Sequence, residues 1–326
     1  MPARQQPIKR AIRKTTRKRR NKRRGQLGKK FFLSMLFILA FVVVYQFFWD
    51  DIQTQLGIQL EGFGSGSGSI ILAENEILVS FIDVGQGESI LIRSRNNAVL
   101  IDGGEHRERN AVLGYLRNAG VRRLCYVVAT HPHSDHIGGL ITVLGRLEIG
   151  NVVMPDVIND TPTFDRFLEV IENNNIPVIF PLPGDRLQAG IIDLLIIAPP
   201  NPHPGPARNP NNGSIVLRLE HGQNSFMFTG DAERELENWM VSSDIDLSAN
   251  VLNLGHHGSR TSTTEAFLDA VNPRVAVISV GANNTYNHPH PEVMERLNAR
   301  NVNIYRTDQL GTIRMITDGY QISILR

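Results

Sequence analysis

The sequence predicts an α/β protein in which two β-sheets pack face to face, with helices on their outer surfaces and one membrane-spanning helix before them. From about residue 77 onward, short runs of β-branched and aromatic residues alternate with segments of helical periodicity. The predicted strands fall into two groups, each followed by helices, as expected for two packed sheets. Far upstream lies an apolar run of 19 residues without a charge.

The N-terminal segment has the pattern of a membrane anchor. Residues 1–30 carry 14 Lys or Arg and no Asp or Glu, and the uncharged run 31–49 follows. This run is long enough for a helix across the hydrocarbon core. Its basic flank is expected to stay in the cytoplasm, with Asp50 and Asp51 on the far side. A cleaved signal peptide is the alternative, but the apolar core of a signal peptide usually spans about 7–15 residues.

The predicted organisation places the folded body outside the plasma membrane, on a single-pass chain with a cytoplasmic N-terminus. The basic arm 1–30 is expected to contact anionic membrane lipid, although such a segment can also bind nucleic acid. Residues 50–69 contain a Gly-Ser run too poor in side chains to pack, and we interpret them as a flexible linker. The folded body is then expected to cover residues 70–326.

Charge and cysteine content limit what this body can do. Beyond residue 30 the chain has 20 Lys or Arg against 32 Asp or Glu, a formal charge of −12. Such a body does not attract nucleic acid by long-range steering, so a phosphate substrate must be held locally, by a metal or a few side chains. The single cysteine, Cys125, has no partner for an intrachain disulfide, and we predict it to be a buried strand residue.

The elements of the body follow in order from its hydrophobic periodicity. Strands are predicted near residues 77–83, 89–93, 98–102, 124–130, 152–154, 178–180, 193–198, 214–220, 225–229, 251–254, 275–280, 303–305, 312–317 and 321–325. Helices are predicted near residues 109–119, 138–146, 164–173, 232–239, 263–271 and 291–298.

Candidate metal ligands lie between the strand ending near residue 130 and the helix that follows. His131, His133, Asp135 and His136 fall within six positions. In an extended turn, side chains at i and i+2 point the same way, so His131 and His133 can meet one metal. Asp135 and His136 can then face a second. Imidazole with carboxylate suits zinc, manganese or iron rather than calcium. The alternative is a polar loop that is histidine-rich by chance, which the flanking strand and helix disfavour.

The His-x-His-x-Asp-His run resembles the signature of the metallo-β-lactamase superfamily, whose fold is a four-layer αβ/βα sandwich. Two further motifs extend this resemblance. Leu100–Gly104 resembles the strand-end aspartate motif, which implies that Asp102 orients the histidine loop. Phe228–Asp231 resembles the motif whose aspartate bridges two metals, which implies a catalytic role for Asp231, together with Asp135.

The run Leu254–Ser259 resembles the late histidine motif that completes the second metal site in this superfamily. Either His256 or His257 can be the ligand. The position directly after the strand slightly favours His256, and the other histidine would then face the substrate.

A closer resemblance runs over about residues 77–320. It rests on the motifs Phe81–Ser89, Asn212–Ser214, His256–Ser262 and Asn287–Pro291. Together they are similar to the C-terminal metallo-β-lactamase-like domain of the ComEC/Rec2 competence proteins, which serve DNA uptake. The resemblance implies a phosphodiesterase or nuclease that acts outside the membrane. The chain departs from this family in two ways. Glu88 stands where the family commonly has Asp, and at most one membrane span is predicted, whereas a full competence channel has many membrane spans.

The first metal site lacks an obvious third histidine, which typical superfamily members have. His203 and His221 are the candidates, both in poor context, and Asn212 and Ser214 occupy the region instead. We therefore expect one or two divalent ions, zinc or manganese, with one held tightly and one labile. Oxygen-rich coordination favours manganese at the weaker site.

Residues near the late histidine motif are candidates for substrate contact. Ser259 and Arg260 follow the His-His-Gly turn and are expected to reach a phosphate, with a solvated loop charge as the alternative for Arg260. His288 and His290 are predicted to line the cleft, although polar histidines before a helix starting at Pro291 would show the same pattern.

Three functions stay open on the sequence alone. The first is a membrane-tethered phosphodiesterase or nuclease acting on DNA or another phosphodiester. The second is a hydrolase of a small ester, lactam or cell-envelope phosphodiester, because the fold supports many chemistries. The third is a non-catalytic binding module stabilised by metal, and the sequence does not fix an oligomeric state.

Overall fold

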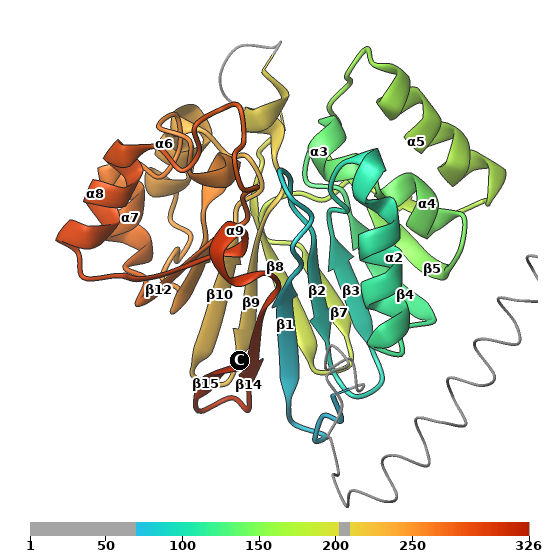
Figure 1. The fold of residues 1–326 in the computed structure, drawn as a ribbon, viewed down its shortest axis with the longest axis horizontal. Helices are drawn as coiled ribbons and strands as arrows, with labels where there is room; N and C mark the ends of the chain where they lie inside the picture. The colour runs from blue at the N-terminus through green and yellow to red at the C-terminus, as the bar shows by residue number, and fades with distance from the viewer. Residues whose placement is uncertain (1–69, 202–208, 326) are drawn as a thin grey trace, which may run out of the picture. The chain divides into compact units, whose positions relative to one another are not determined.

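The computed structural model describes residues 70–201 and 209–325, the coloured parts of Figure 1. They belong to one compact unit, Ser67–Arg326. The predicted basic arm, the membrane helix 31–49 and the linker 50–69 lie outside the described residues. Within the described part of the chain, no helix combines the length and apolar character needed to cross a membrane.

The first sheet has eight strands in the order β15-β14-β1-β2-β3-β4-β5-β6. Its strands are β1 (Ile77–Phe81), β2 (Ile90–Arg93), β3 (Ala98–Ile101), β4 (Arg123–Val128), β5 (Glu148–Val153), β6 (Val178–Ile179), β14 (Ile313–Thr317) and β15 (Ile322–Leu325). Pairing is antiparallel from β15 to β3 and parallel from β3 to β6. Strands β1 and β3 are buried along their whole length, which is why they consist almost entirely of Val, Ile, Leu, Phe and Ala.

The second sheet has seven strands in the order β13-β12-β11-β10-β9-β8-β7. They are β7 (Arg186–Ala189), β8 (Ile192–Ala198), β9 (Val216–His221), β10 (Asn224–Phe228), β11 (Val251–Asn253), β12 (Val275–Ile278) and β13 (Asn303–Arg306). Here β7 to β10 are antiparallel and β10 to β13 are parallel. Each sheet therefore has a parallel half, whose strands end at one common edge.

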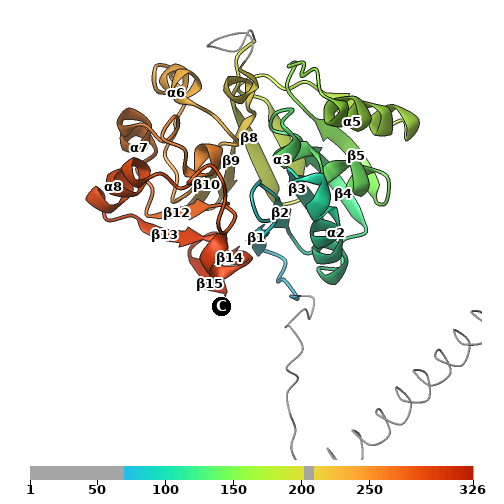
Figure 2. The same cartoon turned by 45° about the horizontal axis from the view of Figure 1, so that its top comes forward.

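The two sheets pack against each other through a shared apolar core. Phe81 of β1 and Phe228 of β10 lie with their ring centroids 6.3 Å apart across this interface. Two further apolar clusters fix helices to the outer faces. Figures 1 and 2 show the resulting layers, helix, sheet, sheet, helix, which confirm the predicted sandwich of two sheets.

The helices divide between the two outer faces as Figure 2 shows. On the first sheet lie α2 (Arg109–Asn118), α3 (Ser134–Ile137), α4 (Leu140–Leu144) and α5 (Pro162–Asn173), and on the second α6 (Arg234–Val241), α7 (Glu265–Val271) and α8 (Pro291–Ala299). The short helix α9 (Thr307–Leu310) follows β13, single 3₁₀ turns lie at η1 (His106–Glu108) and η2 (Pro210–Gly213), and η3 (Gly255–Gly258) is a turn with two left-handed residues.

Three local predictions need correction. The helix predicted at 138–146 is confined to α4, and a separate short helix, α3, precedes it; the two glycines between them lie against another loop, where a Cβ on Gly139 would collide with the carbonyl oxygen of Gly103. Strand β7 was not predicted, since it is short and lies at the sheet edge. Cys125 is a strand residue as predicted, but it is only partly buried.

Candidate metal centre

Histidine and aspartate side chains gather where the parallel strands of both sheets end. Asp102 follows β3, the loop that begins at Thr130 follows β4, Asp231 follows β10, and η3 follows β11. Because parallel strands present their carboxyl ends at one edge of a sheet, the packing of the two sheets brings these four segments together. The candidate site therefore draws on both halves of the sandwich.

The first cluster contains His131, His133 and Asp231. The Nε2 atom of His131 lies 3.0 Å from Nδ1 of His133 and 3.5 Å from Oδ2 of Asp231. Burial, reinforced by the neighbouring His136, lowers the pKa of His131, and burial likewise lowers the pKa of His133. Both rings are therefore neutral near pH 7 and have a lone pair available for a metal.

The second cluster contains Asp135, His136 and His257. Nε2 of His257 lies 3.3 Å from Oδ2 of Asp135 and 3.7 Å from Oδ1 of Asp231. Nε2 of His136 lies 3.1 Å from the same Asp231 oxygen. Asp231 thus directs Oδ2 at the first cluster and Oδ1 at the second, which is the arrangement of a bridging carboxylate.

These donor sets fit divalent ions. In a tetrahedral site with bonds of about 2.0–2.2 Å, donor atoms stand roughly 3.3–3.6 Å apart, close to the 3.0–3.7 Å separations measured here. His136 Nε2 and Asp231 Oδ1 are buried and make no well-directed hydrogen bond. Buried polar atoms without partners are costly, and a cation between them would remove that cost.

Carboxylates set the protonation of the second cluster. Burial alone would lower the pKa of His136, but Asp231 and Asp102 outweigh it and raise that pKa well above its ordinary value. Asp231 and Asp135 raise the pKa of His257 against burial in the same way. Metal ligands must be unprotonated, so divalent ions that bind here displace protons.

Asp102 lies directly beneath the second cluster and is fully buried. Its Oδ1 accepts the backbone N–H of Thr130 at 2.8 Å, and its Oδ2 accepts the Thr130 hydroxyl and His136 Nδ1, each at 2.7 Å. An ionised carboxylate can only accept, so His136 carries its proton on Nδ1 and directs Nε2 toward Asp231. This is the orienting contact that the sequence predicts for Asp102.

Glu88 lies behind the same ring and is fully buried. It accepts a hydrogen bond from Asn253 Nδ2, and burial, with the charge of Asp102, raises its pKa to about 7. The sequence marked this position only as a departure from the competence-type motif. The structure makes it part of the buried layer that supports His136, within reach of Asp102.

The two adjacent histidines of η3 have different surroundings. Both have left-handed backbone angles, with φ 51° at His256 and 55° at His257. His257 donates Nδ1–H to the Ser279 carbonyl at 2.9 Å and directs Nε2 at Asp135. His256 instead places Nδ1 3.1 Å from Glu233 Oε1 and Nε2 3.7 Å from Asp231 Oδ2. The slight sequence preference for His256 therefore does not match the geometry, which favours His257 for the second cluster.

Sequence reasoning missed Glu233, which holds His256 in place. Its carboxylate accepts from Asn209, Asn211 and Thr261 as well as from His256. Burial raises its pKa, but these hydrogen bonds dominate and bring the pKa down to about 2. The available signal was its position two residues after Asp231.

Asn212 and Ser214 support the bridging aspartate through its backbone. Asn212 Oδ1 accepts the N–H groups of Glu233 and Leu236 at 3.3 and 3.2 Å, at the start of α6. Ser214 Oγ accepts the N–H of Asp231 at 3.1 Å. Both residues are fully buried, so they fix the loop instead of contacting substrate directly.

The two histidines considered as a third ligand do not join the site. His221, at the end of β9, lies beside Thr317 at the opposite end of the strands. His203 lies outside the described residues. Among the residues that the structure describes, the first cluster has two histidines and Asp231.

The remaining predicted contacts divide into two groups. His288 lines the cavity above the metal ligands. His290 accepts the backbone N–H of Arg260, and the exposed Arg260 side chain lies 3.4 Å from Glu292. Ser259, Arg260 and His290 are not among the residues that line the cavity. The geometry thus favours the solvated-charge interpretation of Arg260.

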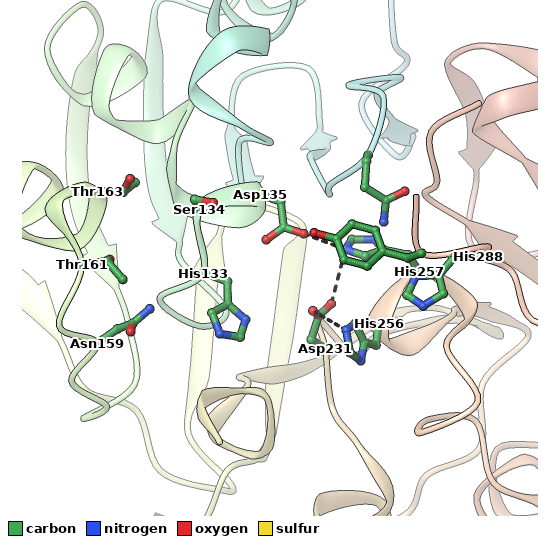
Figure 3. Close-up of a pocket in the computed structure, with 12 residues that line it drawn as sticks. His133, Ser134, Asp135, Asn159, Thr161, Thr163, Asp231, His256, His257 and His288 are labelled. Carbon is green, nitrogen blue, oxygen red and sulfur yellow. Dashed lines mark hydrogen bonds and ion pairs between the residues drawn. The ribbon is translucent and has the colours of Figure 1, made fainter. Parts of the chain in front are cut away.

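A cavity of about 450 Å³ opens over both clusters. In Figure 3, Asn159, Thr161 and Thr163 lie on one side of it and His256, His257 and His288 on the other, with Asp231 between them. The other lining residues are Gln86, His133, Ser134, Asp135 and Tyr286. Each cluster therefore presents part of its donor set to the cavity, His133 in the first, Asp135 and His257 in the second, and Asp231 in both.

Residues 82–282 match the model of the metallo-beta-lactamase superfamily, and the chain belongs to that superfamily. With this fold and these ligand clusters, it is a metal-binding member of a hydrolase family.

Its relatives include competence proteins, as the sequence predicted. The chain is 32% identical over 254 residues to ComE operon protein 3 of Bacillus subtilis, covering 72% of this chain and 32% of that protein. It is 33% identical over 245 residues to Competence protein ComA of Neisseria gonorrhoeae, covering 74% and 32%. Recombination protein 2 of Haemophilus influenzae is 32% identical over 243 residues, covering 73% and 28%. The chain thus spans about a third of the length of these relatives.

Two solved structures share the fold. The diiron β-hydroxylase CmlA of Streptomyces venezuelae aligns with a TM-score of 0.50 at 14% identity, covering 76% of this chain and 54% of that one. Igni18, a metallo hydrolase of Ignicoccus hospitalis, aligns with a TM-score of 0.50 at 13% identity, covering 73% and 98%. At such identities the likeness shows the fold alone.

Proposed function

We propose that this protein is a metal-dependent phosphodiesterase that acts as a nuclease on DNA. The observation that carries the proposal is Asp231, whose two carboxylate oxygens face separate donor clusters at 3.1–3.7 Å. Two adjacent divalent ions, zinc or manganese, would supply activation of water and stabilisation of the charge that develops on a transferring phosphoryl group. The similarity to competence and recombination proteins supports DNA as the substrate class.

The chain's own residues have distinct roles in this proposal. His131 and His133 would hold the first ion, and Asp135, His136 and His257 would hold the second. Asp231 would contribute one carboxylate oxygen to each site. Asp135 also lines the cavity, where burial alone would raise its pKa, but the hydrogen bond with His257 and the charge of His136 lower it, so the carboxylate stays ionised as a ligand beside the reacting atoms.

His256 belongs to the substrate side of the site. Glu233 accepts its Nδ1–H and fixes the ring, while Nε2 faces the cavity beside Asp231. A ring held in this way is placed to hydrogen-bond a phosphate oxygen without reorganising.

We further propose that the hydrolase body is tethered to the plasma membrane by a helix at residues 31–49. The basic arm 1–30 would contact anionic lipid on the cytoplasmic side and place the body outside. A body with 20 Lys or Arg against 29 Asp or Glu, a formal charge of −9 over residues 70–326, would then depend on its metals, not on long-range attraction, to hold a phosphodiester.

The test is hydrolysis of bis-p-nitrophenyl phosphate and of single- and double-stranded DNA by the full chain, with zinc or manganese. We expect metal-dependent cleavage that the Asp231→Ala variant loses. Asp246→Ala is the matched control, because Asp246 is a surface aspartate paired with Arg218, with a side chain 66% exposed. No cleavage by a protein that binds metal tightly would overturn the proposal in favour of an ester or lactam hydrolase or a binding module.

A further inference from the structure

We infer that the cavity binds a nucleoside unit next to the metal centre, with its planar base stacked on Tyr286. The inference rests on the proposed phosphodiesterase function and names the part of the substrate that is recognised. Tyr286 lines the cavity, yet its side chain is 61% exposed. An exposed aromatic ring at the mouth of a polar cavity offers a free face to a planar ligand group.

Tyr286 is supported from below by a second ring. It stacks on His288, with ring centroids 5.6 Å apart and planes inclined by 26°. His288 is itself 9% exposed and lies 5.5 Å from His256, centroid to centroid. These rings therefore lead from His256, beside Asp231, outward to the cavity mouth, along a path that a nucleoside attached to the scissile phosphate can take.

The loop that carries both rings is held rigidly by Asn284. Its Oδ1 accepts the N–H groups of Tyr286 and His288 at 3.2 and 2.9 Å, and its Nδ2 donates to the carbonyls of Gly281 and His288 at 3.0 and 2.7 Å. Gly281 N–H in turn donates to Gln86, another lining residue. Stacking on a ring whose backbone is already fixed loses little conformational entropy, which favours binding.

The opposite wall offers neutral hydrogen-bonding groups. Asn159 donates to the carbonyl of Pro132 at 2.9 Å, so the wall is attached to the histidine loop. Thr161 and Thr163 lie beside it in Figure 3. Among the described residues that line the cavity, none is Lys or Arg. Aromatic and neutral polar walls suit a base and sugar, so the cavity would bind a DNA substrate through one nucleoside beside the scissile phosphate.

The experiment compares two phosphodiesters with the same leaving group, thymidine 5′-(p-nitrophenyl phosphate) and methyl p-nitrophenyl phosphate. We measure the ratio of their kcat/KM values with the full chain and manganese. Base stacking on an aromatic side chain predicts that Tyr286→Ala lowers this ratio by about 5- to 150-fold, mainly through KM. Tyr286→Phe, which keeps the ring, should retain the ratio.

Tyr320→Ala is the matched control, since Tyr320 is a tyrosine 78% exposed next to β15. A ratio that Tyr286→Ala leaves within twofold of the parent would overturn the inference. If the parent protein hydrolyses neither ester, the proposed function fails, and calorimetric titration of the manganese-loaded protein with thymidine 5′-monophosphate decides the inference separately. Weaker binding by Tyr286→Ala supports it, and equal binding overturns it.

Discussion

Replacing Asp102 by Asn tests how much the metal centre depends on the buried layer beneath it. Asp102 has a left-handed backbone, φ 55°, which Asn tolerates better than most residues. The two side chains are also nearly equal in size. The substitution therefore changes charge and hydrogen-bonding capacity while leaving packing and backbone geometry in place.

The size of the effect follows from the three hydrogen bonds that Asp102 accepts. If the amide oxygen keeps the Thr130 N–H, the amide NH₂ must face the Thr130 hydroxyl and His136 Nδ1. His136 then either loses its partner or moves its proton to Nε2, the atom that the metal needs. Loss of such an orienting partner typically weakens metal binding about 10- to 100-fold, equivalent to about 1.4–2.8 kcal/mol.

The assay is calorimetric titration of the metal-free full chain with zinc and with manganese, alongside the Asp246→Asn control. We expect Asp102→Asn to weaken binding at the cluster that contains His136 and to keep the circular dichroism spectrum of the parent. Unchanged affinity for both ions, with the fold intact, would refute the argument that Asp102 sets the tautomer of His136.

Further predictions concern the neighbouring residues. His257→Ala should lower the amount of bound metal measured by elemental analysis, whereas His256→Ala should retain the ion beside Asp135. The reverse result would make His256 the metal ligand and His257 the residue on the substrate side. Asn212→Ala removes the acceptor for two buried N–H groups at the start of α6 and should cost about 1–3 kcal/mol of unfolding free energy in urea, while an unchanged midpoint would contradict this. The lowered pKa of Glu233, about 2 against 4.5, means that its stabilisation is present above pH 4.5 and lost as the pH falls toward 2. The Glu233 side chain is 13% exposed, so solvent screens its charge in part, and we expect a contribution on the order of 1 kcal/mol; Glu233→Gln should make the stability in urea less dependent on pH over that range.

The sequence predicted the sandwich because its interior strands are unusually apolar. Ile77–Phe81 and Ala98–Ile101 are buried on both faces, so they read as continuous hydrophobic runs bounded by polar residues. Strand β7 was not predicted because it is an edge strand with alternating exposure, and its exposed positions include charged residues such as Arg186. The break between α3 and α4 depends on a close contact between distant loops, which local periodicity does not record.

At the site, the order of the motifs identified the residues but not their orientation. Which of His256 and His257 faces the second cluster depends on two consecutive left-handed residues in η3. The local sequence pattern does not predict this backbone conformation. Glu233 had no predicted role, because its partners lie on η2 and on the loop after η3. Long-range packing, not residue type, decides these details.

Asn212 and Ser214 occupy the region where typical superfamily members have the third histidine of the first metal site, and this difference affects both metal sites. These side chains hold the Asp231 loop through its backbone, so they fix the bridging carboxylate but add no donor to the first cluster. Among the described residues, the first cluster contains Asp231 and two histidines, whereas Asp135 and two histidines, with the other oxygen of Asp231, form the second. We therefore expect the first site, with fewer donors and no carboxylate of its own, to bind metal more weakly. Asp102 hydrogen-bonds His136 directly and reaches His131 only through the Thr130 hydroxyl, so its loss should weaken the second site more than the first and narrow the difference in affinity between them.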